Sequence, residues 1–141
     1  MDRIIDGEGR ILGRVSSYAA KSLINGDNVV IINAEKIIIS GHLRDIVTKY
    51  KQKVELKDKA NPEHSPYISR RPDLFVKRVV RGMLPYQYPK GKNAYKRLRV
   101  YIGMPSGLPK PDEHVLKKGE EVYENIITVK TLSEKLGYRF D

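Results

Sequence analysis

The feature that most constrains the fold is the uninterrupted β-branched run VVII at residues 29–32. A strand with one face in water alternates apolar and polar residues, whereas an unbroken apolar run is typical of a strand buried on both faces. Such strands occur mostly in parallel sheets that helices cover. Segments of helical periodicity precede and follow the run, so the chain is predicted to be an α/β protein with a mostly parallel sheet.

Apolar periodicity places the other elements along the chain. We expect helices over about residues 11–25, 41–54 and 72–84, and a short last helix at the capping-box pattern of Thr131 and Glu134. We expect strands at residues 3–6, 29–33, 37–39, 98–102 and 125–130. Pro89 and Gly91 predict a loop between the third helix and the strand at 98–102.

The length of 141 residues fits one domain. Residues 1–141 are therefore treated as a single unit, in which about residues 103–121 form a Pro/Gly-rich arm. No apolar run approaches the roughly 20 residues of a membrane helix, and the polar, acidic start of the chain predicts no secretory signal. The absence of cysteine excludes a disulfide framework, a zinc ribbon and cysteine catalysis.

The formal net charge of +10 is concentrated in the middle of the chain. Residues 36–99 hold 17 lysines and arginines against 5 acidic residues, whereas residues 1–35 and 100–141 each carry a net charge of −1. A charge that serves only solubility need not cluster, whereas a binding surface does. The distribution therefore predicts a polyanionic partner.

A nucleotide-dependent enzyme is the main alternative, because Gly7, Gly9 and Gly13 stand between the first strand and the first helix. The dinucleotide-binding pattern G-x-G-x-x-G requires glycine where the chain has Leu12, and no Gly-Lys-Ser/Thr phosphate loop is present. The histidines lack the spacing of helical metal sites. We therefore expect no enzyme activity, cofactor, metal or small-molecule substrate. The glycines are expected to form a tight turn, and Gly13→Ala to cost on the order of 1 kcal/mol if that backbone is crowded.

Three basic segments are candidates for contact with RNA, and the helix expected at 41–54 is one of them through Arg44 and Lys49. The third helix carries Lys77 and Arg81 four residues apart, on a face largely distinct from its apolar stripe. Residues 90–99 contain no acidic side chain, and interleaved tyrosines suit the unpaired bases of folded RNA. The predicted RNA-binding residues are Arg44, Lys49, Arg70, Arg71, Lys77, Arg78, Arg81, Lys90, Lys92, Tyr95, Lys96, Arg97 and Arg99.

The sequence of this region resembles the signature of universal large-subunit ribosomal protein thirteen. The signature is carried by VRGMLP at residues 80–85, GK at 91–92 and LRVYIG at 98–103. Four upstream pieces also resemble the family. LGRV at 12–15 with AAK at 19–21 is similar to its first helix, and VIINAEK at 30–36 to its second strand. SG at 40–41 is similar to the turn after that strand, and RPD at 71–73 to the start of the third helix. The segment after Gly41 and the arm from Pro105 to Glu121 depart from the bacterial pattern and resemble the archaeal and eukaryotic branch.

The resemblance, which covers about residues 6–103, implies a structural protein of the large ribosomal subunit, and not an enzyme. It implies contact with large-subunit ribosomal RNA, neighbouring large-subunit proteins as partners, a part in early subunit assembly, and a cytoplasmic location in the large subunit. It also implies a three-layer α/β/α fold with a central, mostly parallel four-stranded sheet. A free nucleic-acid-binding regulator is the other alternative, and the lack of a recognisable base-reading module disfavours it.

The arm differs from the basic region in its charge. Residues 104–121 carry a net charge of −1. Because an RNA-binding tail would be strongly basic, we expect the arm to rest on neighbouring protein or on its own fold. The expected anchors are Leu108, Val115 and Leu116.

Overall fold

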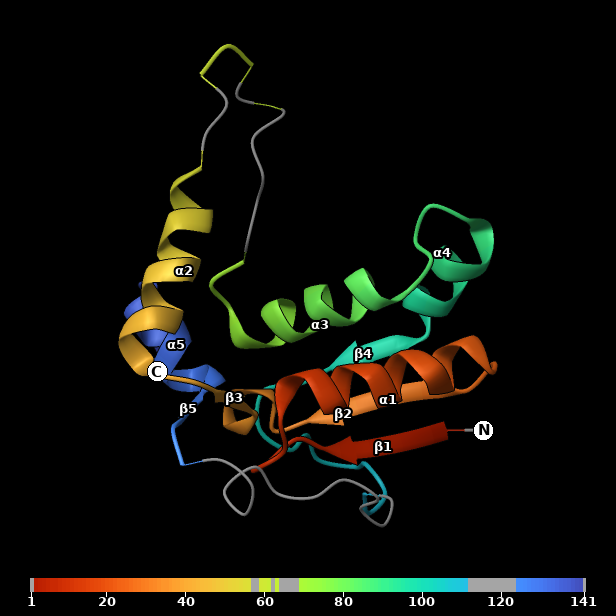
Figure 1. Cartoon of the computed structure of the whole chain (residues 1–141). Coiled ribbons are helices and arrows are strands. Elements are labelled where there is room, and N and C mark those ends of the chain that lie inside the picture. The colour runs from red at the N-terminus through yellow and green to blue at the C-terminus, as the bar shows by residue number, and fades with distance from the viewer. Residues whose placement is uncertain (1, 57–58, 62, 64–68, 112–123, 141) are drawn as a thin grey trace.

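The computed structural model describes residues 2–56, 59–61, 63, 69–111 and 124–140. Its elements are β1 (Asp2–Asp6), α1 (Leu12–Ile24), β2 (Asn28–Ile32), the 3₁₀ helix η1 (Ala34–Lys36), β3 (Ile38–Ser40), α2 (Leu43–Glu55), α3 (Pro72–Met83), α4 (Pro89–Lys96), β4 (Leu98–Val100), β5 (Ile126–Thr128) and α5 (Val129–Lys135). Figure 1 shows α1 and α3 beside each other across the parallel strands, with α2 and α5 at one end and α4 at the other. The predicted α/β class is confirmed.

The strands β1, β2 and β4 form a parallel sheet in that order. Ile5 of β1 lies opposite Ile31 of β2, which lies opposite Val100 of β4. Successive side chains of a strand point to opposite faces of the sheet. Val29 and Ile31 on one face are fully buried, whereas on the other face Ile32 is buried and Val30 is half-buried. The VVII run therefore forms the expected strand, with one face fully buried and the other partly buried.

The central sheet has three described strands and not the expected four, because β3 pairs with β5 in a separate antiparallel sheet. A parallel neighbour of β2 would need a crossover of about a dozen residues, whereas residues 33–37 alone link β2 to β3. This link turns sharply at Asn33, whose φ is +55°. An isolated parallel bridge joins Ile11, directly before α1, to Ile38 of β3. The fold implied by the resemblance is thus observed only in part, as helices packed on a mostly parallel sheet.

One apolar core lies between α1, α3 and the parallel sheet. Val15 and Leu23 of α1 and Val76 and Val80 of α3 are fully buried. Their spacing of three to four residues or its multiples places them on one face of each helix. Met83 continues the same spacing, three residues after Val80, but is 42% exposed. The core therefore fixes which face of α3 points away from the sheet.

Two helices in the C-terminal half of the chain, α4 and α5, differ from the sequence-based expectation. The segment with Pro89 and Gly91 forms the helix α4 in place of a loop. Pro89 suits a first helical turn because its ring fixes φ, and Ala94 anchors the helix since it is fully buried. The last helix begins earlier than expected, because the hydroxyl of Thr128 accepts a hydrogen bond from the N–H of Thr131 at 3.2 Å and caps α5.

The turn after β1 is crowded at Gly7 and open at Gly13. Gly7 donates its N–H to the carbonyl of Ile32 at 3.0 Å, and a Cβ added to Gly7 would lie 2.5 Å from Cγ1 of Ile37. A Cβ on Gly13 would meet no heavy atom within 4 Å. The crowding that would make Gly13→Ala costly is therefore absent, and close packing of the turn depends on Gly7.

Of the arm expected at about 103–121, the structure describes residues 103–111. Residues 103–111 contain no helix or strand, and Leu108 is half-buried. Val115 and Leu116 lie outside the described residues. Among the described helices, none combines the length and the apolar character needed to cross a membrane.

Candidate nucleic-acid interface

The helix α3 turns one face to the core and carries cations on the rest of its surface. Phe75, Val76 and Val80 are buried against the core. Arg78 is exposed, while Lys77 and Arg81 are half-buried and stand one turn apart. Since residues four apart on a helix lie on the same face, these two cations act from one side of α3.

Lys77 and Arg81 pack over tyrosine rings from the following segment and α4. Nζ of Lys77 lies 5.0 Å from the ring centroid of Tyr95, and the guanidinium carbon of Arg81 lies 4.0 Å from that of Tyr86. The two rings meet edge to face, with centroids 5.5 Å apart. A ring attracts a cation without neutralising its charge. Lys77, Arg81, Tyr86 and Tyr95, here called the cation–tyrosine cluster, therefore hold two positive charges in fixed positions.

The position of the cluster depends on the contact between α4 and the turn that follows α3. Gly91 is buried, and a Cβ on it would lie 2.0 Å from the carbonyl oxygen of Pro85. Tyr88 donates its N–H to the same oxygen at 3.0 Å, and Lys92 donates its N–H to the carbonyl of Tyr88 at 3.1 Å. The close approach of backbone to backbone thus places Tyr86 and Tyr95 next to α3.

Burial raises the pKa of the Tyr95 phenol above its usual value of 10.0, although nearby Arg81 and Arg78 lower it in part. The phenol therefore keeps its proton throughout the physiological pH range. A protonated phenol can donate a hydrogen bond as well as accept one. Tyr95 is thus suited to contact both phosphate oxygens and 2′-hydroxyl groups.

The helix α4 carries three further exposed cations, namely Lys90, Lys92 and Lys96. Together with Arg78 and the cation–tyrosine cluster they form what we call the α3–α4 surface. In the part of the chain that the structure describes, the ion pairs join Arg3 to Asp27, Lys36 to Glu8, and Arg71 to Asp73. None of these pairs involves a cation of the α3–α4 surface, so its positive charge is available to a polyanion.

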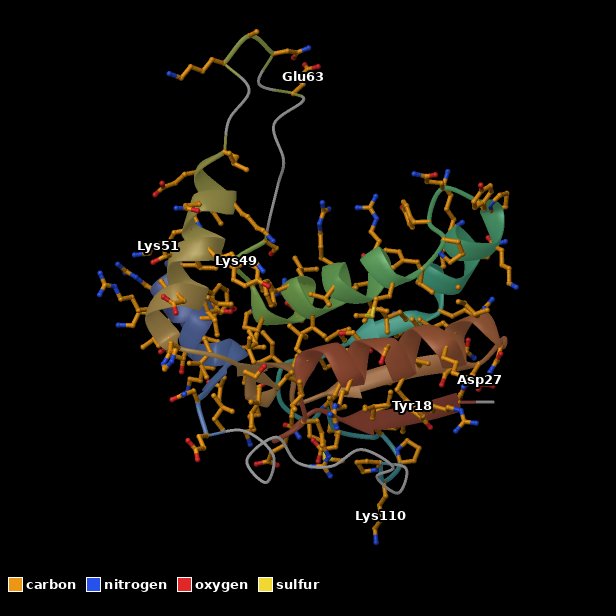
Figure 2. All side chains as sticks on the ribbon, in the orientation of Figure 1. Tyr18, Asp27, Lys49, Lys51, Glu63 and Lys110 are labelled. Atoms are coloured by element: carbon orange, nitrogen blue, oxygen red, sulfur yellow. The ribbon has the colours of Figure 1, made fainter. Side chains whose placement is uncertain are left out.

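The predicted residues of α2 form a second basic group beside α3. Arg44 and Lys49 are exposed, and Nζ of Lys49 lies 5.8 Å from the ring centroid of Tyr50. The ring of Tyr50 meets that of Phe75 edge to face at 5.2 Å, which ties α2 to the start of α3. Figure 2 shows Lys49 and Lys51 on α2, apart from α4.

The remaining predicted cations differ in whether their charge faces solvent or is engaged within the protein. Arg70 is exposed just before α3, whereas Nε of Arg71 forms an ion pair with Asp73 at 2.8 Å. Arg97 donates a hydrogen bond to the carbonyl of Leu23 at the end of α1, so we assign it a structural part. Arg99 is exposed on β4, between two residues that face the core. Its side chain therefore points to the other face of the sheet.

Tyr86 belongs to the site but was not among the predicted site residues. Its position in the chain, directly after the helix-ending Pro85, does not show that the turn brings its ring back over Arg81. A cation and a tyrosine five residues apart, with a proline between them, only weakly indicate a contact between the two side chains. Among the described residues, no group of three His, Asp or Glu side chains is placed to hold a metal ion.

Comparison with known proteins shows which family the chain is similar to. The model of the family described as Ribosomal protein L13 matches residues 2–106. The Large ribosomal subunit protein uL13 of Methanocaldococcus jannaschii is 41% identical over 138 residues, which cover 97% of this chain and 98% of that protein. The proteins of the same name from Methanosphaera stadtmanae and Archaeoglobus fulgidus are 43% and 40% identical. The matches cover 99% and 96% of this chain, and 100% and 88% of those proteins.

Proposed function

The chain belongs to the ribosomal protein L13 family, and from this premise we propose that its α3–α4 surface binds large-subunit ribosomal RNA. The family is a structural constituent of the large ribosomal subunit and not an enzyme. The proposed function is therefore one of binding and positioning, and no reaction is assigned to the chain.

The observation that carries the proposal is the set of cations on α3 and α4 that have no carboxylate partner among the described residues. Most protein contacts to a nucleic acid are made to phosphate and sugar, and they fix the protein's position without reading sequence. The cation–tyrosine cluster supplies charge for phosphates, and its phenols supply hydrogen bonds for 2′-hydroxyl groups. Arg44, Lys49 and Arg70 extend the basic region towards α2.

The location and the other partners follow as parts of the same proposal. The protein takes its place in the large subunit of cytoplasmic ribosomes, touches neighbouring large-subunit proteins, and joins the subunit early in assembly. The arm at about 103–121 is proposed to meet protein, because its net charge does not favour RNA. Lys110, at its described end, points into solvent away from α3 and α4 (Figure 2).

A free nucleic-acid-binding regulator would also carry a basic surface, so the two functions need an experiment to separate them. A ribosomal constituent co-sediments with the large subunit in moderate salt, whereas a free regulator remains at the top of the gradient. The basic surface alone does not decide between them, since phosphate contact is common to both.

The salt dependence of RNA binding tests the proposed surface. Each phosphate that a cation neutralises releases counterions, so the logarithm of the binding constant falls with the logarithm of the salt concentration. Lys77→Ala is expected to reduce this slope by about one unit, with little dependence on RNA sequence. The measurement is a filter-binding titration of a large-subunit ribosomal RNA fragment at several salt concentrations.

Lys110→Ala is the matched control, because it removes the same charge from an exposed position remote from α3 and α4. Its slope should equal that of the unchanged protein. An unchanged slope for Lys77→Ala would contradict the proposed surface. A reduced slope for Lys110→Ala would show that the arm, contrary to its assignment, contacts RNA phosphates.

A further inference from the structure

A hollow lies among residues 78–88. Figure 1 shows this stretch of the chain, where it leaves the C-terminal end of α3 and turns towards α4. Its volume is about 400 Å³, within the range of about 300–1,000 Å³ of sites that hold small molecules. Guanidinium groups, an amide and phenol rings line it, and no carboxylate is among the described lining residues. The polar part of the lining comes from Arg78, Arg81, Tyr86, Gln87 and Tyr88.

Gly82 is among the residues that line the hollow. A Cβ added to Gly82 would meet no heavy atom within 4 Å, so the helix backbone itself is accessible there. Beside it, the guanidinium of Arg81 is held over the Tyr86 ring. The side chain of Tyr88 is 66% exposed, and its ring is free to receive a flat partner.

The backbone around the hollow is fixed by its own hydrogen bonds. Tyr86 donates its N–H to the carbonyl of Leu84 at 2.8 Å, and Tyr88 donates to that of Pro85 at 3.0 Å. The contact of Pro85 with Gly91 then holds this turn against α4. The hollow is therefore present before any partner binds, which is the usual state of a small-molecule site.

The chemistry of the lining fits one nucleotide. Guanidinium groups bind phosphate oxygens in pairs of hydrogen bonds, and tyrosine rings stack on bases. The amide of Gln87 can both donate to and accept from the edge of a base. A base within a double helix is already stacked and paired, so only an unpaired nucleotide can offer its base to such a hollow.

We propose that the hollow holds one unpaired nucleotide of RNA, with its base against Tyr88 and its phosphate at Arg78 and Arg81. This inference rests on the proposed function, because it concerns the same surface. It deepens that function from contact with phosphates to the choice of an RNA structure, namely a bulge or a loop in preference to a continuous duplex.

The test compares two RNA hairpins, one with a single bulged nucleotide in its stem and one with the same stem fully paired. Because stacking of one base on a tyrosine strengthens binding by roughly tenfold, the unchanged protein should bind the bulged hairpin about tenfold more tightly. Gly82→Leu fills the hollow and leaves every charge in place. This variant should bind both hairpins with the affinity that the unchanged protein has for the paired one.

Gly13→Leu is the control, since Gly13 is also an exposed helix position with open space around it but lies on α1. It should keep the preference for the bulged hairpin. Tyr88→Ala is a second variant, which removes an exposed ring and should reduce the preference as Gly82→Leu does. On the fully paired hairpin, both variants should keep the salt dependence of the unchanged protein, because every cation remains in place.

Equal binding of the two hairpins by the unchanged protein would overturn the inference. So would a preference that survives in both Gly82→Leu and Tyr88→Ala. Either result leaves the salt dependence due to Lys77 intact, and the proposed function then stands. Failure of the proposed function is different, because Lys77→Ala would then leave the salt slope unchanged for both hairpins.

Discussion

Gly91→Ala is expected to lower the free energy of unfolding by about 3 kcal/mol, which corresponds to a fall in Tm of roughly 10 °C for a chain of this size. The added Cβ would lie 2.0 Å from the oxygen and 2.2 Å from the carbonyl carbon of Pro85. These are backbone atoms, so no side-chain rotation relieves the overlap, and α4 has to move away from the turn after α3. The gain in helix propensity of alanine over glycine, about 1 kcal/mol, does not offset this.

The same movement separates Tyr86 and Tyr95 from Arg81 and Lys77, so RNA binding should weaken together with stability. Thermal unfolding followed by circular dichroism gives the first quantity, and filter binding below the unfolding transition gives the second. Gly13→Ala is the matched control, because Gly13 is also a helical glycine but has open space around it and lies on α1. A Gly91→Ala protein as stable as Gly13→Ala would show that α4 does not pack as described.

Lys77→Gln combined with Arg81→Gln is expected to weaken binding to large-subunit ribosomal RNA by roughly a hundredfold at moderate salt. A hydrogen bond to a charged group contributes about 1.5 kcal/mol or more, and each 1.4 kcal/mol is about a factor of ten. The salt slope should fall by about two units, one for each lost phosphate contact. Glutamine keeps a polar end but lacks the charged groups that lie over the rings of Tyr95 and Tyr86, so the double variant removes the phosphate contacts and the ring contacts together.

The double variant Lys21→Gln with Lys110→Gln is the control for that experiment. It removes the same amount of charge from exposed positions on α1 and at the described end of the arm. Filter binding measures affinity, and sucrose-gradient sedimentation measures the share of protein recovered with large subunits. Equal losses in the two double variants would mean that net charge alone, and not the α3–α4 surface, governs binding.

The parts of the fold that the sequence predicts well are those fixed by local periodicity. The stripes of α1 and α3 and the apolar strand β2 follow from residues close together in the chain. The pairing of β3 with β5 was not predictable in this way, since Ile38 lies opposite Thr128, some ninety residues away. The length of the link after β2 does indicate that β3 is not a parallel neighbour of β2, because the link is too short for a parallel crossover.

Contacts between residues far apart in the chain also limit what the sequence predicts about the site. Lys96 and Arg97 are adjacent cations in one basic stretch, and no local pattern tells them apart. In the structure Lys96 is exposed, whereas Arg97 reaches back to the carbonyl of Leu23 and closes the end of α1. The sequence of the segment that forms α4 predicts a loop, because its helix depends on the packing of Gly91 against the turn at Pro85 and on the burial of Ala94.

The most direct test of the central claim, that the α3–α4 surface meets ribosomal RNA, is site-specific photocrosslinking in assembled large subunits. A photoreactive amino acid replaces Lys92 on α4 in one protein and Lys110 in another, both at exposed positions that leave the cation–tyrosine cluster intact. We expect crosslinks from position 92 to large-subunit ribosomal RNA, and from position 110 to protein or to nothing. Crosslinks to RNA from position 110 with none from position 92 would contradict it.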